Sequence, residues 1–291
     1  MPHVLTLVAA RAAITLAQAD IDAVRDAVRG GEPKILSPGE AAEVSTDAAP
    51  DMNRVRAALG KRPIDAIATG TRGRRKGLLI ADMDSTIVTG ETLDELADFA
   101  GLKEKIAAIT RAAMNGELNF HEALRARVAM LKGLKLDALD KTWDRVRLTP
   151  GAQELVRTMA AHNALTALVS GGFTWFTGRV AALVGFDIHR ANTLLDDGAA
   201  LTGEVGEPIV DRDTKLATLR ELAAERRLRM AATLAVGDGA NDLAMLREAG
   251  LGIAFHAKPI VAAEARAKVD HADLRALLFA QGYRADQFVM E

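Results

Sequence analysis

The sequence predicts an α/β protein with a Rossmann-like parallel sheet and an inserted helical cap, preceded by a small α+β unit. Three observations predict this fold class. From residue 77 onward, short apolar segments alternate with amphipathic helical patterns, as parallel strands joined by crossover helices do. A long helical stretch interrupts this alternation after its first strand, and a separate set of strand and helix patterns precedes it.

The amino-terminal unit is predicted to comprise residues 1–75. Its predicted strands are 4–10, 34–37 and 64–69, and its predicted helices are 20–29 and 52–61. It ends at the basic segment TRGRRKG, residues 71–77. We interpret this segment as a solvated linker rather than a segment that binds an anion or a partner, because charge runs are usually solvated.

The second unit is predicted to comprise residues 76–291. Its predicted strands are 77–82, 164–169, 231–237 and 251–255. Capping signals indicate three helix starts: a capping box of Thr92 and Glu95, Thr149 with Pro150, and Asp213 ahead of a helix over 214–226.

The chain between the first two strands of this unit is too long for a simple crossover. Ordinary connections take about 2–6 residues plus one helix. Residues 90–147 instead contain several helical patterns, such as ETLDELADFAG and FHEALRARVAMLKG. We therefore expect a helical cap inserted beside the carboxyl end of the first strand.

Composition excludes several classes of function. The formal net charge is −2, from 37 basic and 39 acidic side chains, so no overall field attracts nucleic acid or membrane. The chain has no cysteine, which excludes a thiol nucleophile and fits a reducing compartment. The apolar amino terminus lacks preceding basic residues and is interrupted by Arg11, so we expect folded structure there rather than a signal sequence. We expect a soluble cytoplasmic protein with no nucleic-acid or membrane partner.

Two carboxylates, Asp82 and Asp84, end the first strand of the predicted sheet. Side chains two residues apart on a strand share a face, and here they would emerge at the carboxyl edge, where open α/β folds bind ligands. An isolated pair of this kind is more often a turn with capping aspartates. The later strand ends favour a functional interpretation.

Two further signals follow the next strand and helix. Ser170, Gly171 and Gly172 come after the second strand and would offer a hydroxyl and unhindered N–H groups to phosphate oxygens, although an ordinary turn is the alternative. Lys215 is predicted in the first turn of a helix, where a cation opposes the helix dipole. A surface lysine is its alternative, but a broken local rule often marks a functional residue.

The fourth signal is LAVGDGANDLAML, in which Asp238, Asn241 and Asp242 lie between a strand and a helix. Helix capping would explain Asp242, but it does not explain Asp238 between two glycines at the strand end. The combined carboxylates predict a Mg²⁺ site, because Mg²⁺ prefers oxygen ligands and retained waters. None of the six histidines has zinc-site spacing, and we interpret His121, His256 and His271 as structural or surface residues.

The ordered motifs DMDST, SGG, Lys215 and GDGAND resemble the haloacid dehalogenase superfamily of phosphohydrolases over residues 77–275. Within it, the chain resembles the phosphoserine phosphatases, which carry a glutamate after the first motif and a methionine, a phenylalanine and an arginine in the cap. These match Glu91, Met114, Phe120 and Arg127. A carboxylate for an ammonium and a guanidinium for a carboxylate would suit O-phosphoserine.

The resemblance implies a role for each matched residue. Asp82 would be the nucleophile that forms an aspartyl phosphate, and Asp84 the general acid and base. Asp82, the Asp84 carbonyl and Asp238 would hold Mg²⁺. Phosphate would be bound by Ser170, the Gly171 N–H, Lys215 and Asn241. Asp242 would not contact the substrate but would orient the ion or Lys215.

The resemblance also implies a metabolic pathway and possible partners for the protein. It implies the last step of serine biosynthesis. The amino-terminal unit resembles small ACT-type regulatory domains, which implies an amino-acid effector or a homodimer contact there. The alternatives are the same chemistry on another small phosphomonoester, a phosphotransferase or mutase, and a noncatalytic amino-acid or phosphate sensor.

Overall fold

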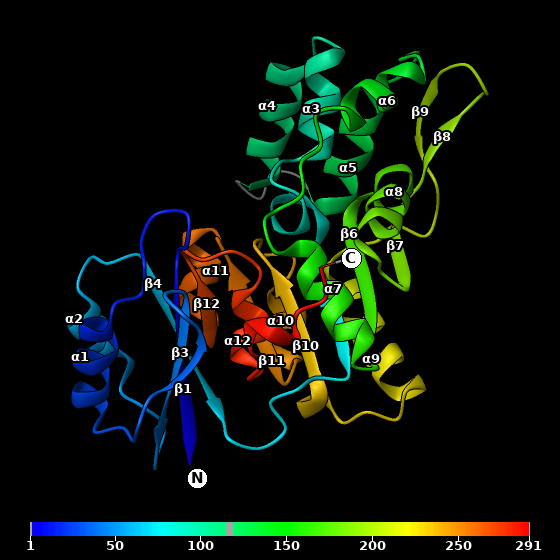
Figure 1. The fold of residues 1–291 in the computed structure, drawn as a ribbon. Helices are drawn as coiled ribbons and strands as arrows, with labels where there is room; N and C mark the ends of the chain where they lie inside the picture. Colours follow the sequence, from blue (N-terminus) through cyan, green and yellow to red (C-terminus); the bar gives the residue numbers. More distant parts are fainter. Residues whose placement is uncertain (1, 115–118, 291) are drawn as a thin grey trace.

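Two sheets, set side by side, form the framework of the computed structural model (Figure 1). It describes residues 2–114 and 119–290, without the side chains of residues 111–114. Among the helices of these residues, none combines the length and apolar character needed to cross a bilayer.

The amino-terminal sheet has four strands in the order β2-β3-β1-β4, all antiparallel to their neighbours. The strands are β1 (His3–Ala9), β2 (Lys34–Ser37), β3 (Ala41–Thr46) and β4 (Ile64–Gly70). Helices α1 (Gln18–Val28) and α2 (Met52–Leu59) supply Val24 and Val55 to a core that contains Leu5 and Leu7 of β1. Strand β3 was not predicted, because AAEVST has few β-branched or large apolar residues.

The opposite face of this sheet packs on the rest of the molecule. Val8, Leu36, Ala41 and Ile67 belong to the same apolar core as the central sheet. This follows from the two-residue period of strands, which turns Val8 away from Leu7 and into the junction. The amino-terminal unit is therefore docked by apolar contact.

Buried polar contacts reinforce the docking. Asp65 of β4 is fully buried, and its carboxylate accepts the main-chain N–H groups of Asp270, His271 and Ala272 at 2.8, 3.0 and 2.7 Å. The guanidinium of Arg74 lies 2.6 Å from Glu43, with their side chains 13% and 9% exposed. Arg74 also donates to the Ala280 carbonyl at 3.1 Å, so the prediction of a solvated linker over 71–77 is wrong at Arg74, which contacts both units.

The central sheet has six parallel strands in the order β12-β11-β10-β5-β6-β7. Its strands are β5 (Leu78–Ala81), β6 (Leu165–Phe173), β7 (Ile188–Asn192), β10 (Thr233–Gly237), β11 (Leu251–Phe255) and β12 (Ala267–Val269). Its helices are α7 (Ala152–Ala161), α8 (Thr174–Val184), α9 (Arg212–Glu225), α10 (Leu243–Glu248), α11 (Pro259–Glu264) and α12 (Ala276–Ala280). Alternate residues of β5 enter two different cores, Leu79 on one face and Leu78 and Ile80 on the other.

The three predicted helix starts are wrong by one or two residues. Helix α3 (Thr92–Phe99) has Glu91 rather than Thr92 at its N-cap, and α7 has Gly151 there. Helix α9 is capped by Asp211, whose carboxylate accepts the N–H groups of Asp213 and Thr214. Asp211 and Asp213 are both good N-cap residues, so composition alone does not choose between them.

The inserted helices form a separate group above the carboxyl edge of the central sheet (top of Figure 1). We call α3, α4 (Lys103–Met114), α5 (Phe120–Ala129) and α6 (Asp137–Trp143) the cap helices. A hairpin of β8 (Leu194–Asp196) and β9 (Leu201–Val205) lies against α5. The chain leaves the core and returns side by side, because Val88 and Leu148 form an isolated antiparallel bridge.

Candidate active site

The candidate site lies at the carboxyl edge of the central sheet, beneath the cap helices. Asp82 follows β5, Asp238 follows β10, and Ser170 lies in β6, which is the neighbour of β5. Ser170 and Gly171 were predicted to follow a strand ending at 169, but β6 continues to Phe173 past a shift in its register with β7. The parallel order of the strands brings side chains distant in sequence to one edge.

Lys215 is the buried cation beneath this edge. Its Nζ lies 2.7 Å from Asp82 Oδ1 and 2.7 Å from Asp242 Oδ1, and the three side chains are 1%, 7% and 0% exposed. Burial alone would lower the pKa of Lys215, but the two carboxylates outweigh it and raise the pKa. The lysine is thus a fixed positive charge beside Asp82.

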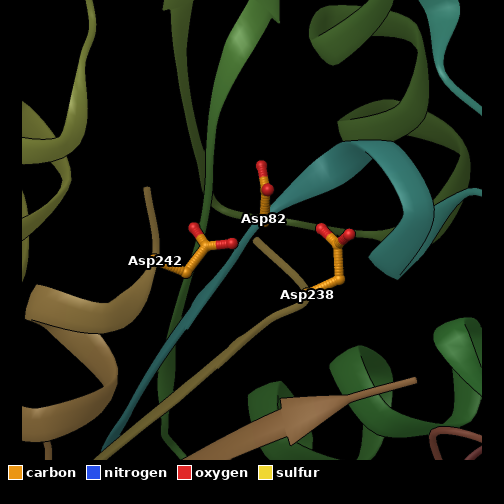
Figure 2. Close-up of side chains that lie close together, drawn as sticks. All are labelled: Asp82, Asp238 and Asp242. Atoms are coloured by element: carbon orange, nitrogen blue, oxygen red, sulfur yellow. The ribbon is translucent and has the colours of Figure 1, made fainter. Parts of the chain in front are cut away.

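Three carboxylates converge at the same place (Figure 2). One oxygen from each of Asp82, Asp238 and Asp242 lies within 4.8 Å of the others. Asp242 is already committed, since Oδ1 contacts Lys215 and Oδ2 accepts the Gly239 N–H at 3.1 Å. Asp82 Oδ1 is also engaged, by Lys215 and by the Met83 N–H at 2.8 Å. Asp82 Oδ2 and the Asp238 carboxylate remain to contact a hard cation, and such oxygen donors fit a divalent ion.

The environment of Asp84 favours its protonated form. Its Oδ1 accepts the Thr92 N–H at 2.8 Å, and its Oδ2 accepts the Ser170 hydroxyl at 3.3 Å. Burial and the nearby charge of Glu91 raise the pKa of Asp84 to about 7. Asp82 lies beside the cation of Lys215 and Asp84 lies near the anion of Glu91, so two carboxyl groups two residues apart differ in their electrostatic surroundings.

Gly172 is required by this packing. A Cβ atom there would lie 2.8 Å from Asp84 Oδ2 and 3.1 Å from Ser170 Oγ. The Gly172 N–H also donates to Ser170 Oγ at 2.9 Å, which orients that hydroxyl. Any side chain at this position would displace Asp84 or Ser170.

A cavity of about 550 Å³ opens between the sheet edge and the cap helices. Its lining includes nine of the predicted site residues, namely Asp82, Asp84, Glu91, Phe120, Arg127, Ser170, Gly171, Asp238 and Asn241. Lys215 and Asp242 lie beneath it, in contact with Asp82 or with each other. Met114 ends α4, and its side chain lies outside the described residues.

The cap contributes charged and aromatic groups to this cavity. Glu91 accepts the Ser85 hydroxyl at 2.7 Å. Arg127 is on α5, where burial lowers its pKa while Asp94 and Glu91 oppose that shift. Phe120 begins α5 and lies over Gly171, since a Cβ atom on that glycine would be 3.5 Å from its ring.

The sequence analysis missed Lys258 and Asp94, which also line the cavity. Lys258 follows β11, so the strand-end argument used for Asp82 and Asp238 would have found it. Asp94 lies in the first turn of α3, where an acidic residue has an ordinary explanation in the helix dipole.

Residues 79–247 match the family model of the haloacid dehalogenase-like hydrolases. The chain belongs to this family. Its membership confirms the predicted resemblance and the parallel sheet with inserted helices, and the amino-terminal antiparallel sheet is consistent with the predicted ACT-like unit.

Several curated relatives of this chain are named phosphoserine phosphatases. The protein of Streptomyces coelicolor is 40% identical over 94% of this chain and 63% of its own length. This chain therefore spans under two thirds of that relative. The protein of Streptococcus thermophilus is 45% identical over 68% of this chain and 93% of its own length.

Solved structures of the family agree with the fold. A haloacid dehalogenase family hydrolase of Salmonella enterica serovar Typhi aligns with a TM-score of 0.83 at 28% identity, covering 96% of this chain and 98% of that one. A substrate-bound phosphoserine phosphatase aligns with a TM-score of 0.66 at 38% identity, covering 70% of this chain and 98% of that one.

Proposed function

We propose that this chain is a magnesium-dependent phosphoserine phosphatase of the cytoplasm, which hydrolyses O-phosphoserine to serine and phosphate as the last step of serine biosynthesis. One observation carries the proposal: a single cavity is lined by Asp82, Asp84 and Ser170 from the sheet edge and by Glu91 and Arg127 from the cap helices. The sheet-edge residues suit phosphoryl transfer, and the cap residues suit a zwitterionic amino acid.

The proposed reaction has two steps. The Asp82 carboxylate attacks phosphorus, the bond from phosphorus to the serine oxygen breaks, and Asp84 donates its proton to that oxygen. Water then attacks the aspartyl phosphate and gives its proton to Asp84, which releases phosphate and regenerates the Asp82 carboxylate.

Charge on the transferring phosphoryl group is the main demand of this chemistry. Ser170, the Gly171 N–H, Asn241 and Lys215 would stabilise it, with Asp242 holding Lys215 in place. Asp82, Asp238 and the Asp84 carbonyl would hold Mg²⁺, which supplies further neutralisation of phosphate charge when bound.

The cap would read the rest of the substrate. In this proposal, Glu91 binds the ammonium and Arg127 the carboxylate of phosphoserine. Phe120, 38% exposed beside the cavity, would cover the bound substrate and exclude water. Met114 is proposed for the same enclosure.

The amino-terminal unit is proposed to bind an amino-acid effector or a second copy of the chain. Strand β2 is an edge strand of its sheet, with Ile35 45% exposed, which leaves a surface for such contacts. Calorimetry of the full chain with serine, and its sedimentation, would test the two roles.

The test of function is a panel of phosphate esters with Mg²⁺ and then with EDTA. We expect phosphoserine to have the highest kcat/KM and EDTA to abolish turnover. If another ester has a higher kcat/KM, the assigned substrate is wrong but the protein is still a phosphatase. Activity that survives EDTA would contradict the metal requirement.

The Asp82→Asn variant tests the nucleophile. We expect turnover to fall by at least about 10⁴-fold, because no carboxylate remains to attack phosphorus. Calorimetry should still detect phosphoserine binding, and no phosphate should remain on the denatured protein. Asp140→Asn, at an exposed position of α6, is the control. Near wild-type turnover in Asp82→Asn would overturn the assignment.

A further inference from the structure

Lys258 lies at the edge of the candidate site, on the side away from Ser170. The strands that carry the site lie in the order β11, β10, β5, β6. Lys258 follows β11, Asp238 follows β10, Asp82 follows β5, and Ser170 lies within β6. Lys258 and Ser170 therefore flank Asp82 from opposite directions. A phosphoryl group at Asp82 would lie between them.

The main chain fixes Lys258 in this place. Its N–H donates to the Asp238 carbonyl at 3.1 Å, and Pro259 begins α11 directly after it. The side chain is 53% exposed, and its Nζ lies 3.7 Å from Asp238 Oδ2. The ammonium is thus anchored at its base but free to turn toward a ligand in the cavity.

The residues that line the cavity carry more negative than positive charge. Among the described residues, five carboxyl groups line the cavity, and Arg127 and Lys258 are the cations that line it. Lys215 lies beneath, held by two carboxylates at 2.7 Å. Arg127 faces Asp94 and Glu91. Within the described part of the chain, the carboxylate paired with Lys258 is that of Asp238, at 3.7 Å, so Lys258 is the lining cation with the weakest pairing.

We propose that Lys258 is a second phosphate-binding cation of this site, which contacts the phosphoryl oxygens from the Asp238 side, opposite Ser170. This inference deepens the proposed function and rests on it. A phosphate dianion entering a cavity rich in carboxylates requires such a charge, and Lys258 can supply it without breaking a buried ion pair.

The same charge should act oppositely on the two ligands. It attracts phosphate, but it repels a divalent cation held by Asp238. Removing it should therefore weaken phosphate binding and tighten Mg²⁺ binding. A residue with a merely structural role would weaken both, because disorder at Asp238 harms both ligands.

The experiment compares Lys258→Met with wild type by calorimetry. Mg²⁺ is titrated into the chelator-stripped protein, and inorganic phosphate into the Mg²⁺-saturated protein. We expect the Kd for phosphate to rise and the Kd for Mg²⁺ to fall, each by about two- to fivefold, as for a partly exposed charge. Added NaCl should shrink both changes.

Two further variants serve as controls. Lys258→Arg keeps the charge and should restore both dissociation constants. Lys141→Met, on α6, removes a lysine of similar exposure, 57%, that is paired with Asp137 at 2.8 Å, and should change neither. Any pattern in Lys258→Met other than weaker phosphate with tighter Mg²⁺ overturns the proposal. The wild-type ester panel judges the function separately, since neither titration uses phosphoserine.

Discussion

At the scale of single residues, the proton of Asp84 links the chemistry to stability. The pKa of this buried carboxyl rises from its ordinary 3.8 to about 7, so the folded protein holds the proton more tightly than the unfolded chain does. Its contribution to stability is full below about pH 4 and is lost as the pH rises through 7. Burial and then the charge of Asp82 raise the pKa of Asp238 to about 6. Asp238 therefore also makes the folded protein less stable as the pH rises.

We therefore expect the Tm of the protein in EDTA to fall between pH 5.5 and pH 8. In the Asp84→Asn variant this fall in Tm should be smaller, because the substituted residue has no proton to lose. Each kcal/mol of unfolding free energy corresponds to about 2–4 °C in Tm. Thermal unfolding of both proteins at several pH values measures it. Parallel curves for the two proteins would show that Asp84 does not hold the proton.

Arg127 is the residue on which substrate selectivity depends in the proposal. Arg127→Ala should lower kcat/KM for phosphoserine by about 10- to 100-fold, because it loses hydrogen bonds to a charged group. An aryl phosphate has no carboxylate to lose, so its kcat/KM should change little. Arg145→Ala, which removes an exposed cap arginine paired with Glu95 and Asp98, is the control. Equal losses on both esters would contradict the proposal.

The positions of the sheet-edge residues could be predicted from strand patterns alone, whereas the cap residues could be predicted only through the family resemblance. Asp82, Ser170 and Asp238 follow from a general rule about where parallel strands end. Glu91 and Arg127 lie on helices where an ion pair is ordinary, so only the family resemblance singled them out. The contact between Lys215 and Asp82 needed the structure, since no local pattern specifies it.

At the scale of elements, the start of α9 joins the cap to the core. The Asp211 carboxylate caps α9 through Thr214 N–H at 2.9 Å, and it lies 2.9 Å from His121 Nε2 of α5. Burial raises the pKa of Asp211, but the bonds from Thr214 and His121 outweigh it and lower the pKa to about 2. The helix held in this way carries Lys215.

Asp211→Ala should lower the free energy of unfolding by about 0.5–2 kcal/mol, the usual cost of a lost cap. It should also lower kcat/KM, because Lys215 and the cap lose a shared support. Asp51→Ala removes the equivalent cap of α2 in the amino-terminal unit and should cost similar stability without lowering kcat/KM. Denaturant unfolding and steady-state kinetics on both variants decide whether activity depends on this cap in particular.

Apolar periodicity predicted strands such as β5 and β10, but it did not predict several weakly patterned strands. Strands β8 and β12 have three residues each, and β7 reads IHRAN, which has little apolar character. Such segments become strands because neighbouring strands supply hydrogen bonds, a tertiary effect that local sequence does not carry.

At the scale of the whole molecule, Asp65 is one of the buried polar groups that hold the amino-terminal unit to the central sheet. Its carboxylate is the acceptor for three main-chain N–H groups of the loop after β12. Asp65→Ala would leave these donors without an acceptor, at a cost of about 1–3 kcal/mol for each buried group. We expect a Tm several degrees lower, whereas Asp26→Ala, at a position 71% exposed, should have little effect. An unchanged Tm in Asp65→Ala would show that the remaining contacts, which include the apolar core and the ion pair of Arg275 with Glu40, hold the units together without Asp65.

The bridge between Val88 and Leu148 has a consequence for how this architecture can change. Because the insertion leaves and re-enters the core at adjacent backbone positions, reinforced by Thr89 N–H to Arg147 and Thr149 N–H to Ile87 at 2.9 Å, it is topologically a cassette. Recombination can exchange such a cassette without altering the strand order beneath it. Under the proposed function, chimeras joined at these two positions would exchange the groups that contact the amino-acid part of the substrate, provided that the contacts of Thr92 N–H with Asp84 and of His121 with Asp211 are kept.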